Sequence, residues 1–223
     1  HAHLLERAGV FMYPTYDVED IDKTVSITVL PVANSTDADL TSYIVSNLIS
    51  ITDGHILFDA LLFSQGNRPA VNTGLSVTRI GRQSQTALVR SVSREVSTFL
   101  ASYSKLVSLT HFGAELSDES AAQLKLGELL FDIFKQPPAT VFPIPALLVI
   151  IGGLWLKWWP DHSTEEIVQI RDSLIETFNK QGSMSDLQPL FLVTNMEQFL
   201  ELLPKYKETL LSSQKPAKHS TKS

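Results

Sequence analysis

The chain has 223 residues, of which 43% are hydrophobic and 19% charged, values typical of a globular protein large enough for one large domain or two small ones. Its net charge of −6 argues against nucleic acid as a main partner. It contains no cysteine, which excludes disulfides and thiolate chemistry.

The first third of the chain alternates short apolar blocks with polar loops. Residues 24–32, TVSITVLPV, are rich in β-branched side chains and predict a strand. Asp39 is a candidate N-cap for a helix that follows it. The remaining expectations are a helix interior over residues 1–8, a surface loop over 9–23, a helix over 40–48, one or two short strands over 55–63, and a loop end or short strand over 77–80.

From residue 83 onward the apolar spacing is helical. Apolar side chains recur at steps of three and four residues between 83 and 109, which predicts a long helix ended by Gly113. Ser117 is expected to cap a second helix, which Pro137 and Pro138 stop. Two further amphipathic helices are expected, over residues 163–179, with Ser163 as cap, and over 196–203, ended by Pro204.

Residues 141–156 form the most apolar run. Its sixteen residues fall short of the roughly 20 that span a bilayer, so a buried helix is the main expectation. Lys157, Trp158 and Trp159 follow the run and fit an interfacial belt, so a membrane segment stays open as an alternative.

Three motifs lie close together in residues 46–81. An SITDG turn spans residues 50–54, a GNRPA loop spans 66–70, and Arg79 lies within GLSVTRIG at 74–81. Taken alone, this pattern predicts the late strands and loops of an α/β layer. Taken alone, Arg79 would be an ordinary surface arginine paired with an acid.

The stretch resembles the alpha subunit of the rotary ATP synthase. That family carries ISITDG, G-x-RPA-x-N-x-G and GLSVSRVG in this order and spacing, and a similar HSRLLERA helix matches residues 1–8. The resemblance is close over residues 24–83, recognisable to residue 136, and rests on helix pattern after residue 138.

The resemblance implies an α/β fold followed by an all-helical bundle. Residues 1–90 would be the C-terminal portion of a RecA-like P-loop NTPase domain, with the strand at 24–32 in its central parallel sheet. Residues 91–205 would form the alpha-type helical domain, and residues 206–223 a basic flexible tail.

The resemblance also implies roles at the interface with a neighbouring beta subunit. Arg79 would reach in trans to the nucleotide held by that subunit and stabilise charge on the transferring phosphoryl group. Ser76 and Val77 would line the interface beside it, and Ser50 of the SITDG turn would lie at its edge. The alternatives are plain loop structure for Ser76 and, within SITDG, a local Asx turn made by Asp53.

A second implied site is the alpha subunit's own, non-catalytic nucleotide pocket. Arg68 and Pro69 resemble residues that flank its adenine, and Gln136 matches a glutamine of the same pocket. The family's KQGQ stands here as KQPP, so Pro137 and Pro138 remove a second polar contact.

The sequence contains no G-x-x-x-x-G-K-[ST] phosphate loop and no metal-ligand spacing among its histidines. We therefore expect no bound cofactor or metal in the isolated chain, which should be inactive. In the assembled complex we expect ATP or ADP with Mg²⁺.

The implied partners are the beta and gamma subunits and a separate or missing N-terminal alpha portion. The membrane would be reached through the complex, on a mitochondrial inner, thylakoid or bacterial plasma membrane. The alternatives are a non-catalytic, alpha-derived interaction or assembly protein and a related hexameric RecA-like motor.

Overall fold

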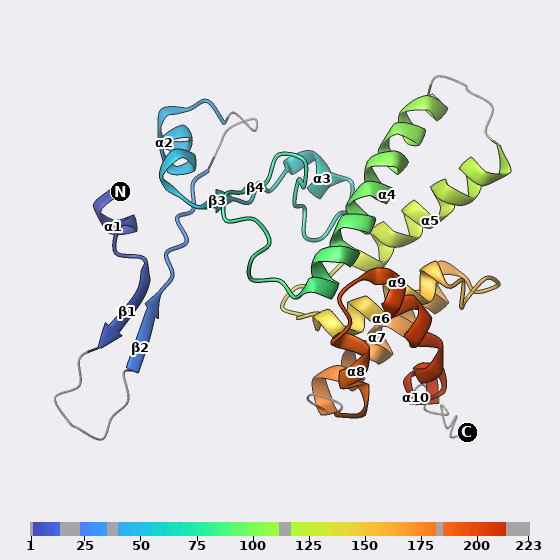
Figure 1. Ribbon diagram of the computed structural model, residues 1–223. Coiled ribbons are helices and arrows are strands. Elements are labelled where there is room, and N and C mark those ends of the chain that lie inside the picture. Colours follow the sequence, from blue (N-terminus) through green and yellow to red (C-terminus); the bar gives the residue numbers. More distant parts are fainter. Residues whose placement is uncertain (1, 14–22, 35–39, 112–116, 182–184, 213–223) are drawn as a thin grey trace, which may run out of the picture. The chain divides into compact units, whose positions relative to one another are not determined.

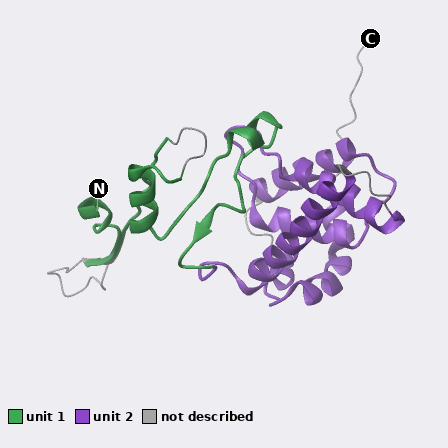
Figure 2. Cartoon of the chain, turned by 90° about the horizontal axis from the view of Figure 1, so that it is seen from above, with its two compact units in different colours: residues 1–81 green, residues 82–223 purple. Residues whose placement is uncertain are grey.

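The computed structural model describes residues 2–13, 23–34, 40–111, 117–181 and 185–212. The chain consists of two compact units, unit 1 (His1–Gly81) and unit 2 (Arg82–Ser223) (Figure 2). Each unit is described by itself.

Unit 1 begins with helix α1 (Ala2–Leu5) and a hairpin-like pair of strands, β1 (Gly9–Tyr13) and β2 (Lys23–Ile27). The strands pair antiparallel (Figure 1), with Gly9 opposite Ile27 and Tyr13 opposite Lys23. The expected loop at 9–23 is therefore wrong for residues 9–13. The strand predicted at 24–32 is shorter and spans Lys23–Ile27. It was expected in a central parallel sheet, but its partner within the described residues is the antiparallel strand β1. The backbone groups of β2 pair with this extended segment of the chain.

The rest of unit 1 consists of short elements: α2 (Tyr43–Ile51), β3 (Gly54–His55), α3 (Ala60–Ser64) and β4 (Val77–Thr78). The short strand expected near residue 77 is confirmed. The strand expectation for 55–63 is wrong beyond His55, because Asp59 accepts hydrogen bonds from the backbone N–H groups of Leu61 and Leu62 and so caps a helix. Asp39, the expected cap of α2, lies outside the described residues.

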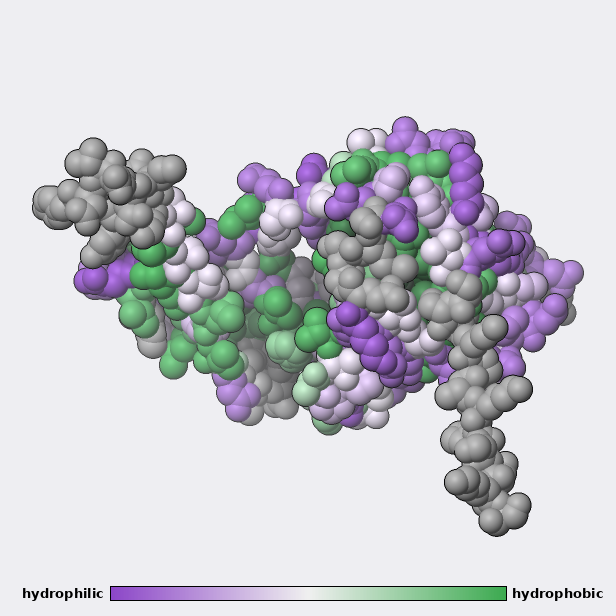
Figure 3. All heavy atoms as spheres, turned by 90° about the horizontal axis from the view of Figure 1, so that it is seen from below, coloured by the Kyte–Doolittle hydropathy of each residue, from purple (hydrophilic) through white to green (hydrophobic). Residues whose placement is uncertain are grey.

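Unit 1 buries few apolar side chains. Val45 and Ala70 are its buried hydrophobic residues in the described part of the chain. Hydrophobic side chains gather instead on its surface (Figure 3). The exposed large apolar residues of unit 1 are Leu4, Val10, Phe11, Met12, Val25, Ile27, Leu30, Val32, Tyr43, Ile44, Ile56, Phe58, Leu61, Phe63, Leu75, Val77 and Ile80. An apolar surface of this extent is typical of an interface.

Unit 2 opens with two long helices that pack side by side (Figure 1), α4 (Ala87–His111) and α5 (Asp118–Phe134). Ser117 caps α5 as predicted, since its hydroxyl accepts a hydrogen bond from the N–H of Ser120. The helices approach closely at Gly127, where an added Cβ would lie 2.0 Å from the ring of Tyr103. Gly113 lies outside the described residues.

Helix α6 (Ile144–Trp155) is the centre of unit 2, which confirms the expectation of a buried helix. Its buried residues are Ala146, Leu148, Val149, Ile150, Ile151, Gly152, Gly153 and Leu154. Gly152 packs under Leu203 and Phe199, while Gly153 packs under Trp159. Among the described residues, no helix is long and apolar enough to cross a membrane.

Helix α7 (Thr164–Gln181) begins with a capping box. Ser163 N–H donates to the Glu166 carboxylate at 2.7 Å, and Glu166 N–H donates to the Ser163 hydroxyl at 3.2 Å. Short elements then complete the bundle: η2 (Ser185–Leu187), α8 (Gln188–Phe191), α9 (Met196–Leu202), η3 (Leu203–Tyr206) and α10 (Lys207–Ser212).

The flexible tail expected from residue 206 is wrong for its first part. Residues 207–212 form α10, and Leu210 is only 1% exposed. Burial of this leucine anchors the segment to the core despite the lysines around it. Residues 213–223 lie outside the described residues.

Arg171 of α7 is a buried cation with 3% exposure. Its Nη1 donates to the carbonyls of Ile133 at 2.8 Å and Lys135 at 3.0 Å, at the C-terminal end of α5. Its Nε and Nη2 donate to Asp172 at 2.8 and 2.6 Å. The guanidinium thereby satisfies carbonyls that the helix end leaves unpaired.

Candidate functional site

The SITDG and GLSVTRIG motifs meet in the small ladder of β3 and β4. Gly54 pairs with Thr78 and His55 with Val77, and Arg79 N–H donates to the Asp53 carbonyl at 2.8 Å. A Cβ added at Gly54 would lie 2.5 Å from the Val77 carbonyl oxygen. The close approach of the two chains therefore requires glycine at this position.

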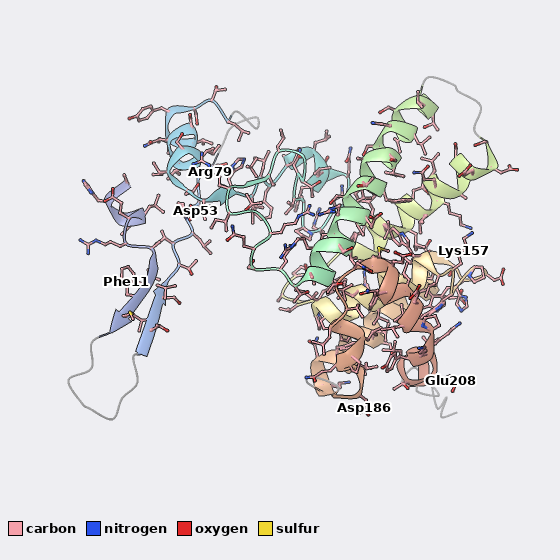
Figure 4. The ribbon with its side chains drawn as sticks, in the orientation of Figure 1. Phe11, Asp53, Arg79, Lys157, Asp186 and Glu208 are labelled. Carbon is pink, nitrogen blue, oxygen red and sulfur yellow. The ribbon has the colours of Figure 1, made fainter. Side chains whose placement is uncertain are left out.

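Arg79 is exposed, and its side chain lies against the end of α2. Its Nη1 donates to the Ser50 carbonyl at 2.8 Å. Figure 4 shows Arg79 and Asp53 next to each other beside this helix. The carbonyl end of a helix carries partial negative charge, which favours a cation there. Within the described residues, Arg79 donates hydrogen bonds from Nη1 and from its backbone N–H. The N–H groups of Nε and Nη2 are therefore left to bind an external oxyanion.

Ser50 and Ser76, two other predicted site residues, use their hydroxyls locally. Ser50 is exposed and donates to the Ser46 carbonyl at 2.8 Å. The half-buried Ser76 donates to the Asn72 carbonyl at 2.6 Å and accepts from Leu57 N–H at 3.0 Å. The hydroxyl of Ser76 thus joins two segments of the loop. Val77, in contrast, has an exposed side chain beside Arg79.

Two residues that sequence reasoning missed hold this loop. Asn72 Nδ2 donates to the Asp59 carboxylate at 3.0 Å, and Asn72 Oδ1 accepts from the N–H groups of Gly74 and Leu75, both at 3.1 Å. The hydrogen bond from Asn72, followed by that from Leu61 N–H, lowers the pKa of Asp59. An Asn two residues before a Gly is the available signal for such a turn.

The residues of the second predicted pocket fall in both units. In unit 1 the Arg68 guanidinium lies over the Phe63 ring at 3.5 Å and donates to the Phe63 carbonyl at 2.7 Å, while Pro69 is exposed beside it. In unit 2 the Gln136 side-chain amide donates to the Thr140 carbonyl. Each of these side chains is engaged within its own unit.

A largely apolar groove of about 1110 Å³ runs beside the β3–β4 ladder in unit 1. Asp53, Gly54, Val77 and Thr78 line it together with apolar side chains from residues 29–32 and 45–61. No group of three or more His, Cys, Asp or Glu side chains in the described ranges is arranged to hold a metal ion. The arrangement offers an exposed guanidinium beside an apolar recess, which is chemistry for binding an anion rather than for general acid–base catalysis.

Comparison with known proteins agrees with the two-part structure. Residues 1–78 match the model of the ATP synthase alpha/beta family, nucleotide-binding domain, and residues 85–190 match that of the ATP synthase alpha/beta chain, C terminal domain. The chain belongs to the ATP synthase alpha/beta family. This confirms the resemblance and the fold class, an α/β nucleotide-binding part followed by a helical domain.

Curated ATP synthase alpha subunits match most of this chain. That of Wigglesworthia glossinidia brevipalpis is 32% identical over 187 residues, which cover 82% of this chain and 37% of the relative. That of Wolinella succinogenes is 38% identical over 174 residues, covering 78% and 33% respectively. That of Haemophilus influenzae is 32% identical over 186 residues, covering 81% and 36%. The chain thus spans well under half the length of these alpha subunits.

Proposed function

We propose that this chain is the C-terminal portion of an ATP synthase alpha subunit and works in an alpha/beta ring. That ring makes ATP from ADP and phosphate with the energy of a transmembrane proton gradient. Family membership supports the subunit assignment. The observation that carries the proposal is the exposed Arg79 guanidinium, which donates to the Ser50 carbonyl, while the backbone N–H of Arg79 donates to the Asp53 carbonyl.

Arg79 would act in trans on the nucleotide bound by a neighbouring beta subunit. A planar, permanently charged guanidinium can donate two hydrogen bonds to phosphoryl oxygens and stabilise the charge that develops during transfer. Ser50 and Val77 would border the same interface, and Ser76 would hold the loop in shape. The Mg²⁺ nucleotide belongs to the assembled complex, and the isolated chain, whose sequence has no phosphate loop, would not turn over ATP.

The partners are beta and gamma subunits and the N-terminal portion of an alpha subunit. The exposed apolar surface of unit 1 supports a need for such partners, because surfaces of this kind are normally covered. Within this proposal residues 1–90 complete a RecA-like domain and residues 91–205 form the helical domain. The complex would be peripheral on an energy-coupling membrane of mitochondrial, thylakoid or bacterial type.

Isolation of the tagged chain from its native membranes, with mass spectrometry of what copurifies, tests the proposal. We expect beta and gamma subunits, together with N-terminal alpha sequence either as a separate chain or in a longer alpha chain. Recovery of neither beta nor gamma would overturn the subunit assignment and favour a separate role in interaction or assembly.

A further inference from the structure

The two segments that carry β3 and β4 continue beyond the ladder as an irregular antiparallel ribbon. Phe58 forms a bridge with Val71, and His55 pairs with Val77. Two residues lie between these paired positions on the first segment, but five lie between them on the second, residues 72–76. The second segment therefore carries three extra residues, and residues 72–76 are called the bulge below.

The shape of the bulge decides where β4 and Arg79 lie. Strand β4 has only two residues, so its own ladder fixes its register weakly. A slip of one residue would turn its side chains to the opposite face. It would also carry Arg79, which follows β4 directly, away from the Ser50 carbonyl to which its Nη1 donates. Bulges are frequent beside active sites because they direct a side chain in this way.

Among the described residues, two side-chain hydrogen bonds tie the far end of the bulge to the first segment. The Ser76 hydroxyl accepts from Leu57 N–H at 3.0 Å. The imidazole Nε2 of His55 lies 2.8 Å from the Leu75 carbonyl oxygen, and Nε2 is the donor because a carbonyl only accepts. His55 thus holds the second segment twice, through its side chain at Leu75 and through its ladder position at Val77.

We propose that His55 is a positioning residue for Arg79. Its imidazole holds the Leu75 carbonyl, fixes the length and shape of the bulge, and so keeps the guanidinium in place at the end of α2. The inference rests on the proposed function, because it gives His55 a role only through the action of Arg79 on a bound nucleotide. It extends that function to a half-buried side chain whose own partner is the protein backbone.

Steady-state ATP hydrolysis by the complex that copurifies with this chain tests the inference. We expect His55→Ala to lower kcat by about tenfold. The loss is smaller than the roughly 10²-fold expected for a catalytic group displaced by about 1 Å, because the Ser76 hydroxyl still ties the bulge. KM should stay within about twofold, since Arg79 acts on charge that develops in the transition state. His162→Ala, the same change at an exposed site of unit 2, is the matched control and should leave both values unchanged.

Replacement of His55 by amide side chains separates the hydrogen bond from the ring. The amide nitrogen in His55→Gln can reach the position of Nε2 and donate to the Leu75 carbonyl, so kcat should return to within about twofold of wild type. His55→Asn places its amide one carbon closer to the backbone, near the position of Nδ1, and should behave like His55→Ala. A His55→Gln complex as impaired as His55→Ala would show that this hydrogen bond has no part in turnover, and the inference would be wrong.

A double-mutant cycle tests whether His55 acts through Arg79. In an Arg79→Ala background, His55→Ala should lower kcat by less than about twofold, because no guanidinium is left to place. A further tenfold loss in that background, wild-type kcat in the His55→Ala complex, or failure of that complex to contain its beta subunit would each overturn the inference. Wild-type turnover of the Arg79→Ala complex would instead reject the proposed function, which the inference requires.

Discussion

Arg79 Nη1 donates a hydrogen bond of 2.8 Å to the carbonyl of Ser50, in the last turn of α2. The backbone N–H of the same arginine donates to the Asp53 carbonyl at 2.8 Å. The guanidinium and the backbone of Arg79 are thus held by one segment, the last turn of α2 and the residues that lead from it to β3. The direction of the guanidinium is set by that segment rather than by an acidic partner, so its positive charge is not neutralised by an ion pair among the described residues.

Replacement of Arg79 by Ala or Lys should abolish most ATP turnover of the assembled complex. Lysine keeps the charge but lacks the planar fork, so both variants should lose about 10³-fold or more in kcat, the range measured when arginine is removed from phosphoryl-transfer sites. Steady-state ATP hydrolysis by the purified complex measures this, with subunit content checked on the same samples.

Arg82→Ala is the matched control for that experiment. Arg82 is also exposed and follows shortly after in the chain, but lies outside the β3–β4 ladder. Its replacement should leave kcat within about twofold, as expected for a surface charge. Equal activity of the Arg79→Ala and wild-type complexes would reject the role in trans and favour an assembly function.

Gly54→Ala should impair turnover strongly, though less than loss of Arg79. The new methyl would lie 2.5 Å from the Val77 carbonyl oxygen, a backbone atom, so β4 and Arg79 must shift. Displacement of a catalytic group by about 1 Å costs on the order of 10²-fold in rate. The assay is the same ATP hydrolysis measurement on assembled complex.

Gly74→Ala provides the comparison for Gly54→Ala. A Cβ at Gly74 would lie 3.5 Å from Asn72 Oδ1, an ordinary contact. This variant should retain turnover within about threefold, because no backbone atom has to move. If both alanine variants behaved alike, the close approach of β3 and β4 would have no part in placing Arg79.

Gly127→Ala should destabilise unit 2. The added methyl would meet the Tyr103 ring at 2.0 Å, and overpacking of this kind costs about 1–3 kcal/mol. Urea unfolding followed by tryptophan fluorescence is a suitable measurement, since all three tryptophans, Trp155, Trp158 and Trp159, belong to unit 2. Lys125→Ala, at an exposed position of the same helix, should change stability by less than about 0.5 kcal/mol. If Gly127→Ala were as stable as wild type, the Tyr103 ring or the two helices could move apart without loss of folding free energy, and the close contact would not stabilise unit 2.

Arg171→Met should lower the free energy of unfolding of unit 2 by about 3 kcal/mol, because the carbonyls of Ile133 and Lys135 would lose their donor in a buried place. Lys180→Met is the control: Lys180 pairs with Glu176 at 2.9 Å on the surface, and its loss should cost about 0.5 kcal/mol or less. Similar losses for the two variants would mean that the carbonyls find other donors.

Asp59 should titrate below its ordinary pKa of 3.8. Hydrogen bonds from Asn72 and then Leu61 favour the charged carboxylate, so its contribution to stability is present above that ordinary value and is lost as pH falls through the lower, folded-state pKa. NMR titration of the side-chain carboxyl carbon measures the pKa directly. Asn72→Ala should move the pKa upward, whereas Asn67→Ala, a change elsewhere in the same loop, should not. An unchanged pKa in Asn72→Ala would contradict the assigned cause.

The helices of unit 2 were largely predictable because their signals are local. Ser117 and Ser163 precede helices with acids in the first turn, and the long helix repeats its apolar residues with helical spacing. Leu210 was missed because lysines dominate its neighbourhood, and only the three-dimensional core shows that it is buried. Arg171 was missed because a charged residue at an interior position is recognised only once the carbonyls of α5 lie next to it.

In unit 1 the sequence predicted which residues gather near Arg79, through the order and spacing of SITDG and GLSVTRIG, but not how they are held. The hydroxyl of Ser76 and the amide of Asn72 bind segments distant in sequence, so no local pattern reveals their partners. Helix α3 is too short for a hydrophobic period, and Asp59 as its cap was the only signal.

Because unit 1 has few buried side chains, a screen for stability and a screen for assembly into a complex would respond to different residues of this chain. Leu30 and Val32 contribute little to the folding free energy of the isolated chain, because they are 83% and 94% exposed. Polar substitutions there would pass a screen for thermal stability or expression, and would be detected only by a screen for incorporation into a complex. A mutational map based on stability alone would therefore score these surface positions of unit 1 as tolerant, although assembly of a complex would constrain them.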